Sequence, residues 1–397
     1  MRKVTILWVF LAFLLRLQIS FLNYLDFIYF PVKEVKAKII NQYKKKNYYV
    51  LKLKNNEVVF FTTNRDELKN LLNENVSLKI FPQKVSFFEY LRTFYVPSFD
   101  LRLLPLSNIE YFIEKQHSSQ EMQNLFKALF LGETIDYAIR EKLSALGISH
   151  LFALSGLHLG IISLVLFLIF GNVYKFFQRF FPYRNRWIDI GIFVLISEFF
   201  YLCLTSFPAS LIRAYVMEVI LFLFAFYLKN PFSLKVLVLT VFIAFYLFFM
   251  KIFGIGFLLS IVGVYYIYLF FRYFNPTFLN GIFLHFYMFL VMFVWSHYFF
   301  GQMNLYQLLS PVVNIVFSLF YPLEALLHLA GVGGVFDDWI ERYLNAGEKF
   351  YYINVSGWFL ILFIMLSLIA FFKKWAFYGI NLLAFIIIFA SIGGEFG

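Results

Sequence analysis

Charged residues and cysteine are both scarce in this sequence. Asp, Glu, Lys and Arg make up only 14% of its 397 residues, whereas 61% are hydrophobic and 23% are aromatic. Soluble domains contain about half apolar residues, so this composition excludes an ordinary soluble fold and indicates a protein whose solvent is the lipid bilayer. The single cysteine, Cys203, lies within an apolar run and excludes an intramolecular disulfide.

Sequence motifs for metals and nucleotides are also absent. The six histidines form no H-x-H or H-E-x-x-H pattern and no cluster with cysteine, so the sequence predicts no metal site. A G-x-x-x-x-G-K-[ST] motif is missing as well, which excludes nucleotide hydrolysis by a P-loop. We therefore predict no cofactor and no enzymatic activity, and any work that the protein does must be driven from outside the chain.

Apolar runs with few charges fill most of the sequence and predict a polytopic α-helical integral membrane protein. By the usual length rule there are about ten spans or partial spans. One run, Leu308–Gly331, contains Pro322 and either crosses the bilayer or dips in and returns. The runs are Val4–Leu15, Ile148–Phe170, Trp187–Phe207, Leu211–Leu228, Val236–Met250, Ile252–Phe271, Phe278–Phe300, Leu308–Gly331, Gly357–Phe372 and Ala376–Ile392.

Positive charges predict the orientation of these runs. Arg2 and Lys3 precede the first run, no cleavage site follows it, and we expect an uncleaved anchor with a cytoplasmic N-terminus. Lys373-Lys374 falls on the cytoplasmic side only if Leu308–Gly331 returns without crossing. The other basic loops fall there by counting crossings: Lys175–Arg186, Lys229–Lys235 and Arg272.

Residues 31–105 belong to a different class and predict a small all-β domain. Lys33–Lys84 contains 12 Lys and Arg against 5 Asp and Glu, which suits a polyanion or an anionic membrane surface, although a merely solvated domain would look the same. A helical stretch, Arg65–Asn73, separates the third and fourth strands, as in a barrel of the OB type. The predicted strands are Val32–Ile40, Asn47–Lys54, Glu57–Thr63 and Val76–Phe81.

An amphipathic linker joins this domain to the apolar runs. Five apolar residues share one helical face, and Gly132–Thr134 interrupts the pattern before Ile135–Leu146 resumes it. We predict four parts: an anchor at 1–30, the basic extracytoplasmic domain at 31–105, interfacial helices at 106–147 and a polytopic domain at 148–397. The shared face consists of Met122, Leu125, Phe126, Leu129 and Phe130.

Small residues after Gly147 follow a 4-3-4-3 spacing. On one continuous helix they form a stripe that lets another backbone approach or lets a narrow aqueous path run alongside. His150 and His158 lie about 80° apart on such a helix and flank the stripe. Each either bonds a carbonyl of a partner helix or lines the path. The stripe consists of Ser149, Ala153, Gly156, Gly160 and Ser163.

Buried charges call for partners because a lone charge in hydrocarbon costs several kcal/mol. Glu198 and Arg213 lie on either side of the turn Ser206–Pro208, and we expect them to pair. Glu324 and His328 are four residues apart and can pair on one helix. Glu218 has no evident partner.

A family resemblance rests on ALFLGETIDYAIREKLSALGISHLFALSGLHLGII, residues Ala128 to Ile162. This block resembles the signature of ComEC-type proteins, the inner-membrane DNA channels of naturally competent bacteria. Weaker echoes follow at PASLIRAYVM (Pro208–Met217), GIGFLLS (Gly254–Ser260) and LLSPVVNIVFSLFYP (Leu308–Pro322). Many members carry a metallo-β-lactamase-like domain with an H-x-H-x-D-H run, which does not occur between Met1 and Gly397, so the chain resembles a short form.

The resemblance implies translocation of single-stranded DNA from periplasm to cytoplasm during natural transformation. It implies an OB-like periplasmic domain after the first span; the family's copy can hold a disulfide and this one cannot. Arg213 matches the arginine of the family's RA block, and arginine suits phosphate. The residues implied for the channel are Gly132, Glu133, Ser149, His150, Ala153, Ser155, Gly156, His158, Gly160, Ser163, Glu198 and Arg213.

The basic domain would guide DNA to the channel mouth by phosphate contacts and base stacking. Expected partners are single-stranded DNA, membrane lipid, a periplasmic DNA receptor, a cytoplasmic motor ATPase or single-strand-binding protein, and further copies of the chain. The aromatic residues Phe60 and Phe61 are further stacking candidates. The DNA-guiding residues are Lys44, Lys45, Lys46, Lys52, Lys54, Tyr48 and Tyr49.

Two alternatives stay open. A proton-coupled solute transporter would use Glu198, Glu218, His150 and His158 as relays. A rhomboid-like intramembrane serine protease would use Ser155 of ALSG with His328 of LHLAG, although the first position of its usual motif is Ala rather than Gly here.

Overall fold

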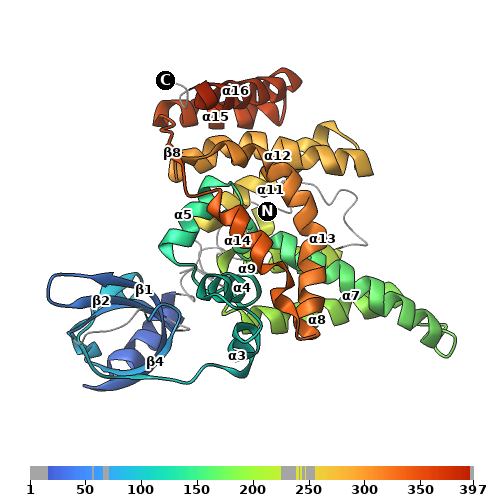
Figure 1. The fold of residues 1–397 in the computed structure, drawn as a ribbon. Coiled ribbons are helices and arrows are strands. Elements are labelled where there is room, and N and C mark those ends of the chain that lie inside the picture. The colour runs from blue at the N-terminus through green and yellow to red at the C-terminus, as the bar shows by residue number, and fades with distance from the viewer. Residues whose placement is uncertain are drawn as a thin grey trace.

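The computed structural model describes residues 17–55, 58–65, 71–224, 238–240, 242–243, 246 and 255–393. The predicted first span, Val4–Leu15, and most of Val236–Met250 lie outside these residues, as does most of the helix predicted at Arg65–Asn73. A small β domain and a larger body of helices make up the described part (Figure 1). The chain is therefore a helical membrane protein with a small β domain, as the sequence predicts.

The β domain is a six-stranded sheet in the order β5-β3-β2-β1-β4-β6. Its first four strands lie where the alternating pattern predicts them. Strands β5 and β6 are consecutive in the chain, yet β5 pairs in parallel with β3 and β6 pairs antiparallel with β4, so one segment joins the two ends of the sheet. The strands are β1 (Lys33–Lys44), β2 (Tyr49–Lys54), β3 (Val59–Asn64), β4 (Asn75–Ile80), β5 (Thr93–Tyr95) and β6 (Ser98–Leu103).

An apolar core fills this closed sheet. Leu51, Leu53 and Phe60 of the central strands are fully buried, and a short helix, α2 (Phe87–Tyr90), covers one opening with Tyr90. Alternate residues point inward because successive side chains of a strand face opposite sides. The core therefore needs no disulfide, and its stability comes from packing.

Three short helices and a helical turn connect the sheet to the apolar body. Gly132 ends α4 in the left-handed conformation, φ 72°, just as the amphipathic pattern predicts an interruption. The apolar face of α4 is buried against α5 and α13. The elements are α3 (Asn108–Glu114), α4 (Gln120–Leu131), α5 (Tyr137–Ala145) and α6 (Ser149–Phe152).

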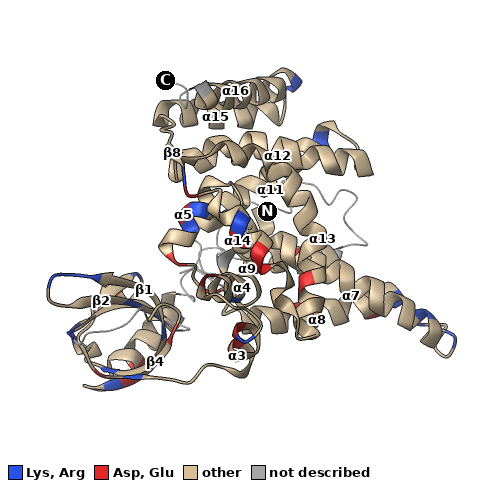
Figure 2. Ribbon diagram, viewed as in Figure 1, with Lys and Arg blue, Asp and Glu red and all other residues tan. Residues whose placement is uncertain are grey.

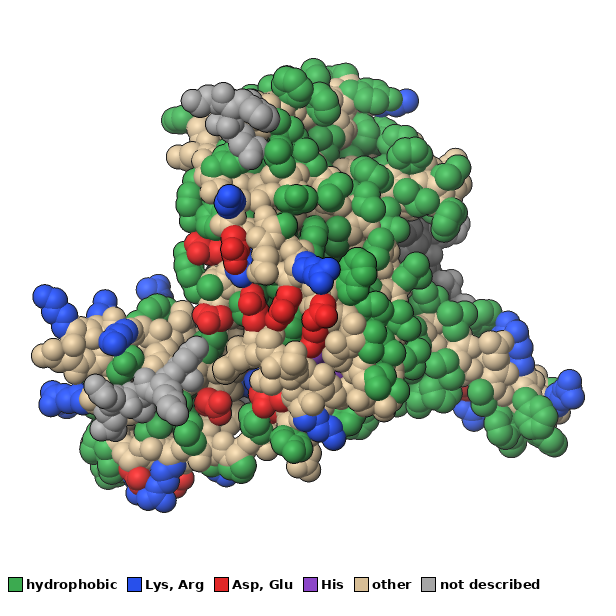
Figure 3. Space-filling view, viewed as in Figure 1, with side chains coloured by type: hydrophobic (Ala, Val, Ile, Leu, Met, Phe, Trp, Pro, Cys, Tyr) green, Lys and Arg blue, Asp and Glu red, His purple; other side chains and the backbone are tan. Residues whose placement is uncertain are grey.

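Six described helices are long and apolar enough to cross a membrane. Large hydrophobic side chains cover much of the face of this body in Figure 3, as expected for helices that contact lipid. The shorter helices α9 (Ala209–Phe224) and α15 (Gly357–Ala370) are also apolar. The longer helices are α7 (Gly156–Phe177), α8 (Arg186–Leu204), α11 (Ile255–Tyr273), α12 (Phe278–Phe299), α13 (Ser310–Leu329) and α16 (Lys374–Gly393).

Helices α11, α12, α15 and α16 form one bundle whose basic loops lie together. The Tyr273 hydroxyl donates to the carbonyl of Ala370 at 2.6 Å, and the Arg272 guanidinium lies 4.3 Å from the centre of the Phe371 ring. Arg272 and Lys373-Lys374 are therefore at the same end of the bundle. The basic segments of these loops and of the α7–α8 loop, blue in Figure 2, lie on the side of the helical body away from the β domain.

Helix α13 contradicts one form of the prediction for Leu308–Gly331. The chain does not turn back at Pro322, because a single helix continues through this residue. Strands β7 (Gln302–Met303) and β8 (Tyr351–Tyr352), which flank α13 and α14 (Asp337–Asn345), pair with each other. The two ends of the segment between them therefore lie side by side.

Candidate functional site

The small-residue stripe does not lie on one helix, so the prediction of a continuous helix is wrong. The backbone of Ala153 is extended after α6, and α7 begins at Gly156. Ser155 caps α7: its hydroxyl lies 3.3 Å from the Leu157 N–H, and its own N–H donates to Nδ1 of His158 at 3.2 Å. His158 is fully buried, and its ring packs edge-on against Tyr321.

Helix α9 approaches α7 closely at Gly156. A Cβ atom at Gly156 would lie 3.2 Å from Cβ of Ala214 and 3.4 Å from a terminal nitrogen of Arg213. Arg213 is 5% exposed, and its Nε donates to the Ser260 hydroxyl at 2.7 Å. The expected pair with Glu198 is not formed, and no other described carboxylate is within ion-pair distance of Arg213.

The hydroxyl of Ser163 links Glu198 to Glu218, for which the sequence suggested no partner. The hydroxyl of Ser163 contacts Oε1 of Glu198 and lies 2.6 Å from Oε1 of Glu218. A hydroxyl donates only one hydrogen, so the second of these hydrogen bonds needs a proton on one of the carboxyl groups. In this geometry the pair therefore carries a proton and at most one negative charge.

Gly160 lies between Arg213 and this carboxyl pair along α7, and a Cβ atom there would have no described neighbour within 4 Å. Ser163 is about 10 Å from Gly156 along the helix axis. The other stripe residues lie apart: Ala153 is exposed and Ser149 bonds Ser144 at 2.9 Å. The stripe residues on α7 therefore face a polar seam between α7, α8 and α9.

His150 is separate from His158 because the helix break changes its direction. Its Nε2 lies 2.9 Å from Oδ1 of Asn314 on α13, and the side chain is exposed. The two histidines thus contact α13 through different partners, a side-chain amide and an aromatic ring. Neither contact with α13 is a hydrogen bond to a backbone carbonyl of that helix.

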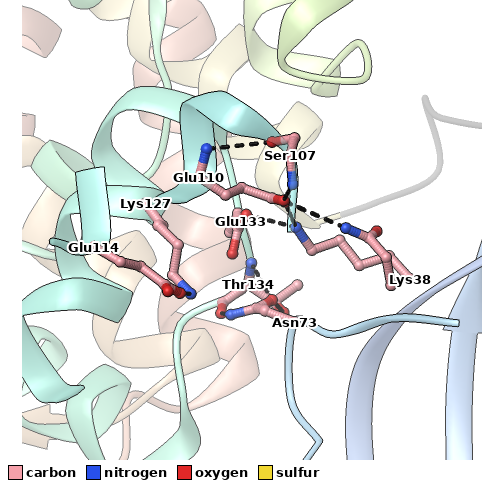
Figure 4. Close-up of polar contacts among 9 residues, drawn as sticks. Lys38, Asn73, Ser107, Glu110, Glu114, Lys127, Glu133 and Thr134 are labelled. Carbon is pink, nitrogen blue, oxygen red and sulfur yellow. Dashed lines mark hydrogen bonds and ion pairs between the residues drawn. The ribbon is translucent and has the colours of Figure 1, made fainter. Parts of the chain in front are cut away.

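Gly132 and Glu133 lie where the helical body meets the β domain. A Cβ atom at Gly132 would meet Cδ1 of Leu154 at 2.8 Å, so the tight turn needs glycine for both space and conformation. Lys38 of β1 donates to Glu133 at 2.5 Å and to Glu110 of α3 at 2.9 Å (Figure 4). These contacts attach the β domain to the helical body, and we name Lys38, Glu110 and Glu133 the docking cluster.

A second contact supports the docking cluster. The Thr134 hydroxyl donates to Oδ1 of Asn73 at 2.6 Å, and the Asn73 amide donates to the Thr134 carbonyl at 2.7 Å (Figure 4). Next to it, Lys127 pairs with Glu114. The residues that follow Gly132 therefore bind the sheet through both charge and amide hydrogen bonds.

The two carboxyl groups of the docking cluster have opposite electrostatic properties. Burial raises the pKa of Glu133 to about 7, although the charge of Lys38 opposes this shift. Burial acts on Glu110 in the same direction, but the hydrogen bonds from Lys38 and from the Ser107 backbone outweigh it and lower its pKa to about 2. Glu110 is thus the permanent anion of the cluster, while Glu133 titrates near neutral pH.

Comparison with family models shows to which family the polytopic part belongs. Residues 129–393 match the model described as Competence protein. The chain belongs to this family. Searches among curated proteins and among solved structures found no match. Membership confirms the resemblance to ComEC-type proteins and implies a role in DNA uptake during transformation.

The DNA-guiding lysines of this competence protein lie in two different places. Lys44, Lys45 and Lys46 are exposed at the tip of the β1–β2 hairpin, where Tyr48 is 41% exposed (Figure 2). Tyr49 is half-buried against the β core. Phe60 is part of that core, so the expectation that it stacks on bases is wrong.

The remaining two lysines follow β2 away from the tip. Lys52 lies 5.5 Å from the centre of the Phe61 ring. Lys54 stands opposite Lys38 in the sheet register, and burial together with the nearby charge of Lys38 lowers its pKa. Of the five DNA-guiding lysines, the three at the hairpin tip are therefore the ones that lie together, exposed, with an exposed aromatic ring beside them.

Sequence reasoning missed two groups of polar residues in this competence protein. One is Lys38 with Glu110, because a lysine and a glutamate 72 positions apart carry no sequence signal of their contact. The other is a buried contact between His117 and Asp337 at 2.9 Å. The predicted pair of Glu324 and His328 is present, with Nδ1 of His328 3.2 Å from the carboxylate.

Proposed function

We propose that this competence protein moves single-stranded DNA from the periplasm to the cytoplasm along the α7–α9 face. Each nucleotide carries a charged phosphate, and charges in hydrocarbon cost several kcal/mol each, so the path must be polar. The face offers Arg213, Gly160 and the protonated carboxyl pair in sequence along α7. In this proposal the chain lies in the bacterial inner membrane with its N-terminus in the cytoplasm and its β domain in the periplasm.

Arg213 is the observation that carries the proposal. A buried arginine normally has a carboxylate partner, and this one has none among the described residues. Its terminal nitrogen lies beside Gly156, in the first turn of α7, where the helix dipole also favours an anion. A passing phosphate would find two positive features at one place.

The β domain supports the same proposal. A three-strand meander, the β1–β4 pair and the parallel β3–β5 pair form a closed sheet, which suits an OB-like barrel. Such barrels bind single strands by combining lysine contacts to phosphate with stacking on aromatic rings. We propose that the β1–β2 hairpin tip receives DNA from a periplasmic receptor, and that a motor or binding protein draws it from the cytoplasmic side.

Substitution of Arg213 tests the proposal. We expect Arg213→Gln to leave DNA in the periplasm and to lower its entry into the cytoplasm by at least about tenfold, the value of one charge-assisted hydrogen bond. Arg213→Lys should retain part of the activity because it keeps the charge but loses the planar fork. The measurement is transformation of a deletion strain with DNase-resistant label scored separately in the two compartments.

A matched control and a contrary result are available. Ser260→Ala removes the neutral partner of Arg213 but keeps the guanidinium, and should have a smaller effect than Arg213→Gln. Normal cytoplasmic entry by Arg213→Gln at equal protein level would contradict the proposed path. Loss of DNA from the periplasm as well would place the defect before the membrane.

The carboxyl pair favours one other function, a proton-coupled solute transporter. That function requires Glu198 and Glu218 to exchange their proton, so Glu198→Gln with Glu218→Gln should abolish it. A DNA path should tolerate these neutral replacements, because they remove at most one negative charge from the pair and the path needs no proton exchange there. The protease alternative lacks its geometry: Ser155 bonds His158, while the ring of His328 lies against His117.

A further inference from the structure

Four buried ionisable side chains form a row where the α3–α4 loop meets the end of α13. Nδ1 of His117 lies 2.9 Å from Oδ1 of Asp337, and Nε2 of His117 lies 3.0 Å from Nε2 of His328. Nδ1 of His328 lies 3.2 Å from the Glu324 carboxylate. These residues belong neither to the proposed DNA path nor to the docking cluster.

The outer contacts of this row determine where two hydrogens are. Nδ1 of His328 is also 3.0 Å from the backbone carbonyl of Glu324, which only accepts, so this nitrogen carries a hydrogen. Asp337 is the first residue of α14, where the helix dipole favours an ionised carboxylate. Nδ1 of His117 then donates to Asp337 and also carries a hydrogen.

With both Nδ1 atoms occupied, two neutral rings would have no hydrogen left for the contact between them. The Nε2 atoms would face each other at 3.0 Å with two lone pairs, which is repulsive. One additional proton converts this contact into a hydrogen bond. If Asp337 holds the additional proton instead, His117 takes its other neutral tautomer and donates from Nε2 to His328. The number of protons held by the row is the same in both cases, one more than two neutral histidines provide.

We propose that His117 and His328 bind this proton between their Nε2 atoms and that it holds the α3–α4 loop against the α13–α14 turn. The described residues contain no cluster of His, Cys, Asp and Glu able to hold a metal ion, so the proton is the ligand that fits. The Asp337 carboxylate at the outer nitrogen of His117 compensates its charge, and the Glu324 carboxyl group lies 3.2 Å from Nδ1 of His328.

Aromatic rings of α4 and a glycine turn hold the two imidazole rings in place. The ring of His117 stacks on Phe126 at 4.3 Å, and Phe130 faces the edge of His328 at 4.8 Å. A Cβ atom at Gly333 would lie 2.5 Å from the His328 ring, so only glycine lets the turn close over it. The N–H of Gly333 donates to the side chain of Gln116 at 2.8 Å.

The charged groups facing the pair come from two elements, Asp337 from α14 and Glu324 from α13; α4 contributes only the apolar rings. Burial lowers the pKa of His117, and Asp337 opposes this effect without outweighing it, so the proton is released as the pH rises. Release would leave repelling lone pairs and free the loop from the turn. The bound proton thus connects α4, which leads to the docking cluster, with α13, which contacts His150 and His158.

Hydrogen exchange of the full chain in lipid nanodiscs tests this proposal. Between pH 5 and 9, after correction for intrinsic exchange, we expect amide exchange at residues 115–119 and 331–337 to rise by about tenfold in one step as the proton leaves. His328→Gln should remove the step, because an amide cannot bind the proton. His285→Gln, at a histidine on α12 far along the chain, should keep it.

A second measurement on the wild type does not depend on any variant folding. With ¹⁵N-labelled histidine, a scalar coupling between the two Nε2 nuclei at low pH would report the shared hydrogen directly, and its loss should follow the exchange step. Absence of this coupling throughout the range, or an exchange step unchanged in His328→Gln, would overturn the proposal. Protection that disappears on addition of EDTA would also overturn it, since the ligand would then be a metal.

Discussion

Glu133 is the residue whose charge state changes the attachment of the β domain. Its folded pKa of about 7 is above the ordinary 4.5, so the folded protein binds this proton more tightly than the unfolded chain. The stability contributed by the protonated form is complete below pH 4.5 and is lost as the pH rises through 7. Glu110, with a pKa of about 2, acts in the opposite direction and only at much lower pH.

We therefore expect Glu133→Gln to flatten the pH dependence of stability. Between pH 5 and 8 the wild type should lose on the order of 2 kcal/mol relative to the variant. The measurement is the difference between the thermal unfolding curves of the two proteins in detergent at several pH values. Identical pH dependence of both would contradict the assignment, and Glu141→Gln, on α5, provides an exposed control.

Single residues also show which features of the site the sequence can predict and which it cannot. Ser155 followed three residues later by His158 is an N-cap pattern with histidine at the position that glutamate usually takes, and it could have revealed the helix break. The predicted pair of Glu198 and Arg213 fails because the two side chains reach α7 at different levels. Arg213 lies beside Gly156, whereas Glu198 bonds Ser163, about two turns further along the helix, and spacing along the chain does not fix this difference.

At the scale of the element, two glycines of α7 allow an effect on helix packing to be distinguished from an effect on DNA passage. Gly160→Leu places a side chain where no described atom lies within 4 Å, so we expect unchanged stability but cytoplasmic DNA entry lowered at least about tenfold by narrowing. Gly156→Leu should instead lower stability, because it pushes α9 away. Unfolding temperature and compartment-resolved transformation distinguish them. Normal entry with Gly160→Leu would exclude this face as the path.

The β1–β2 hairpin makes its own prediction. Reversing Lys44, Lys45 and Lys46 to Glu should weaken binding of a single-stranded oligonucleotide to the purified protein at least about tenfold at low salt and less at high salt, since each phosphate contact releases counterions. Fluorescence anisotropy at two ionic strengths measures this.

The matched control reverses three exposed basic residues elsewhere on the same domain, Lys36, Lys84 and Arg92, to Glu. An equal loss in the control would mean that only net charge matters. No loss in either variant would remove the guiding role from the domain.

Elements were predictable in proportion to the strength of their patterns. Strands β1 to β4 alternate and lie where expected, whereas β5 and β6 are short, flank Pro97 and carry little alternation, so they were missed. Composition alone cannot decide whether an apolar helix crosses. Helix α13 is as apolar as a span, yet Gln307 just before it contacts Gly147, and His328 near its end contacts His117.

For the whole molecule, this arrangement predicts which loops share a compartment. In a Cys203→Ser background, cysteines at Arg179, Asn275 and Lys374 should resist a membrane-impermeant maleimide in spheroplasts and react after permeabilisation. A cysteine at Lys36 should react in both. Labelling of the Lys374 position together with that of Lys36 would show that the segment between β7 and β8 crosses the bilayer, contrary to the pairing of those strands.

The pairing of β7 with β8 also constrains how the protein is made. A ribosome-bound translocon selects segments by hydrophobicity as they emerge, and the stretch Leu305–Leu329 satisfies that criterion. The pairing brings Gln302–Met303 and Tyr351–Tyr352 together, so the chain between them has to fold back after α13. We therefore expect this part of the protein to reach its final arrangement only after β8 has been translated.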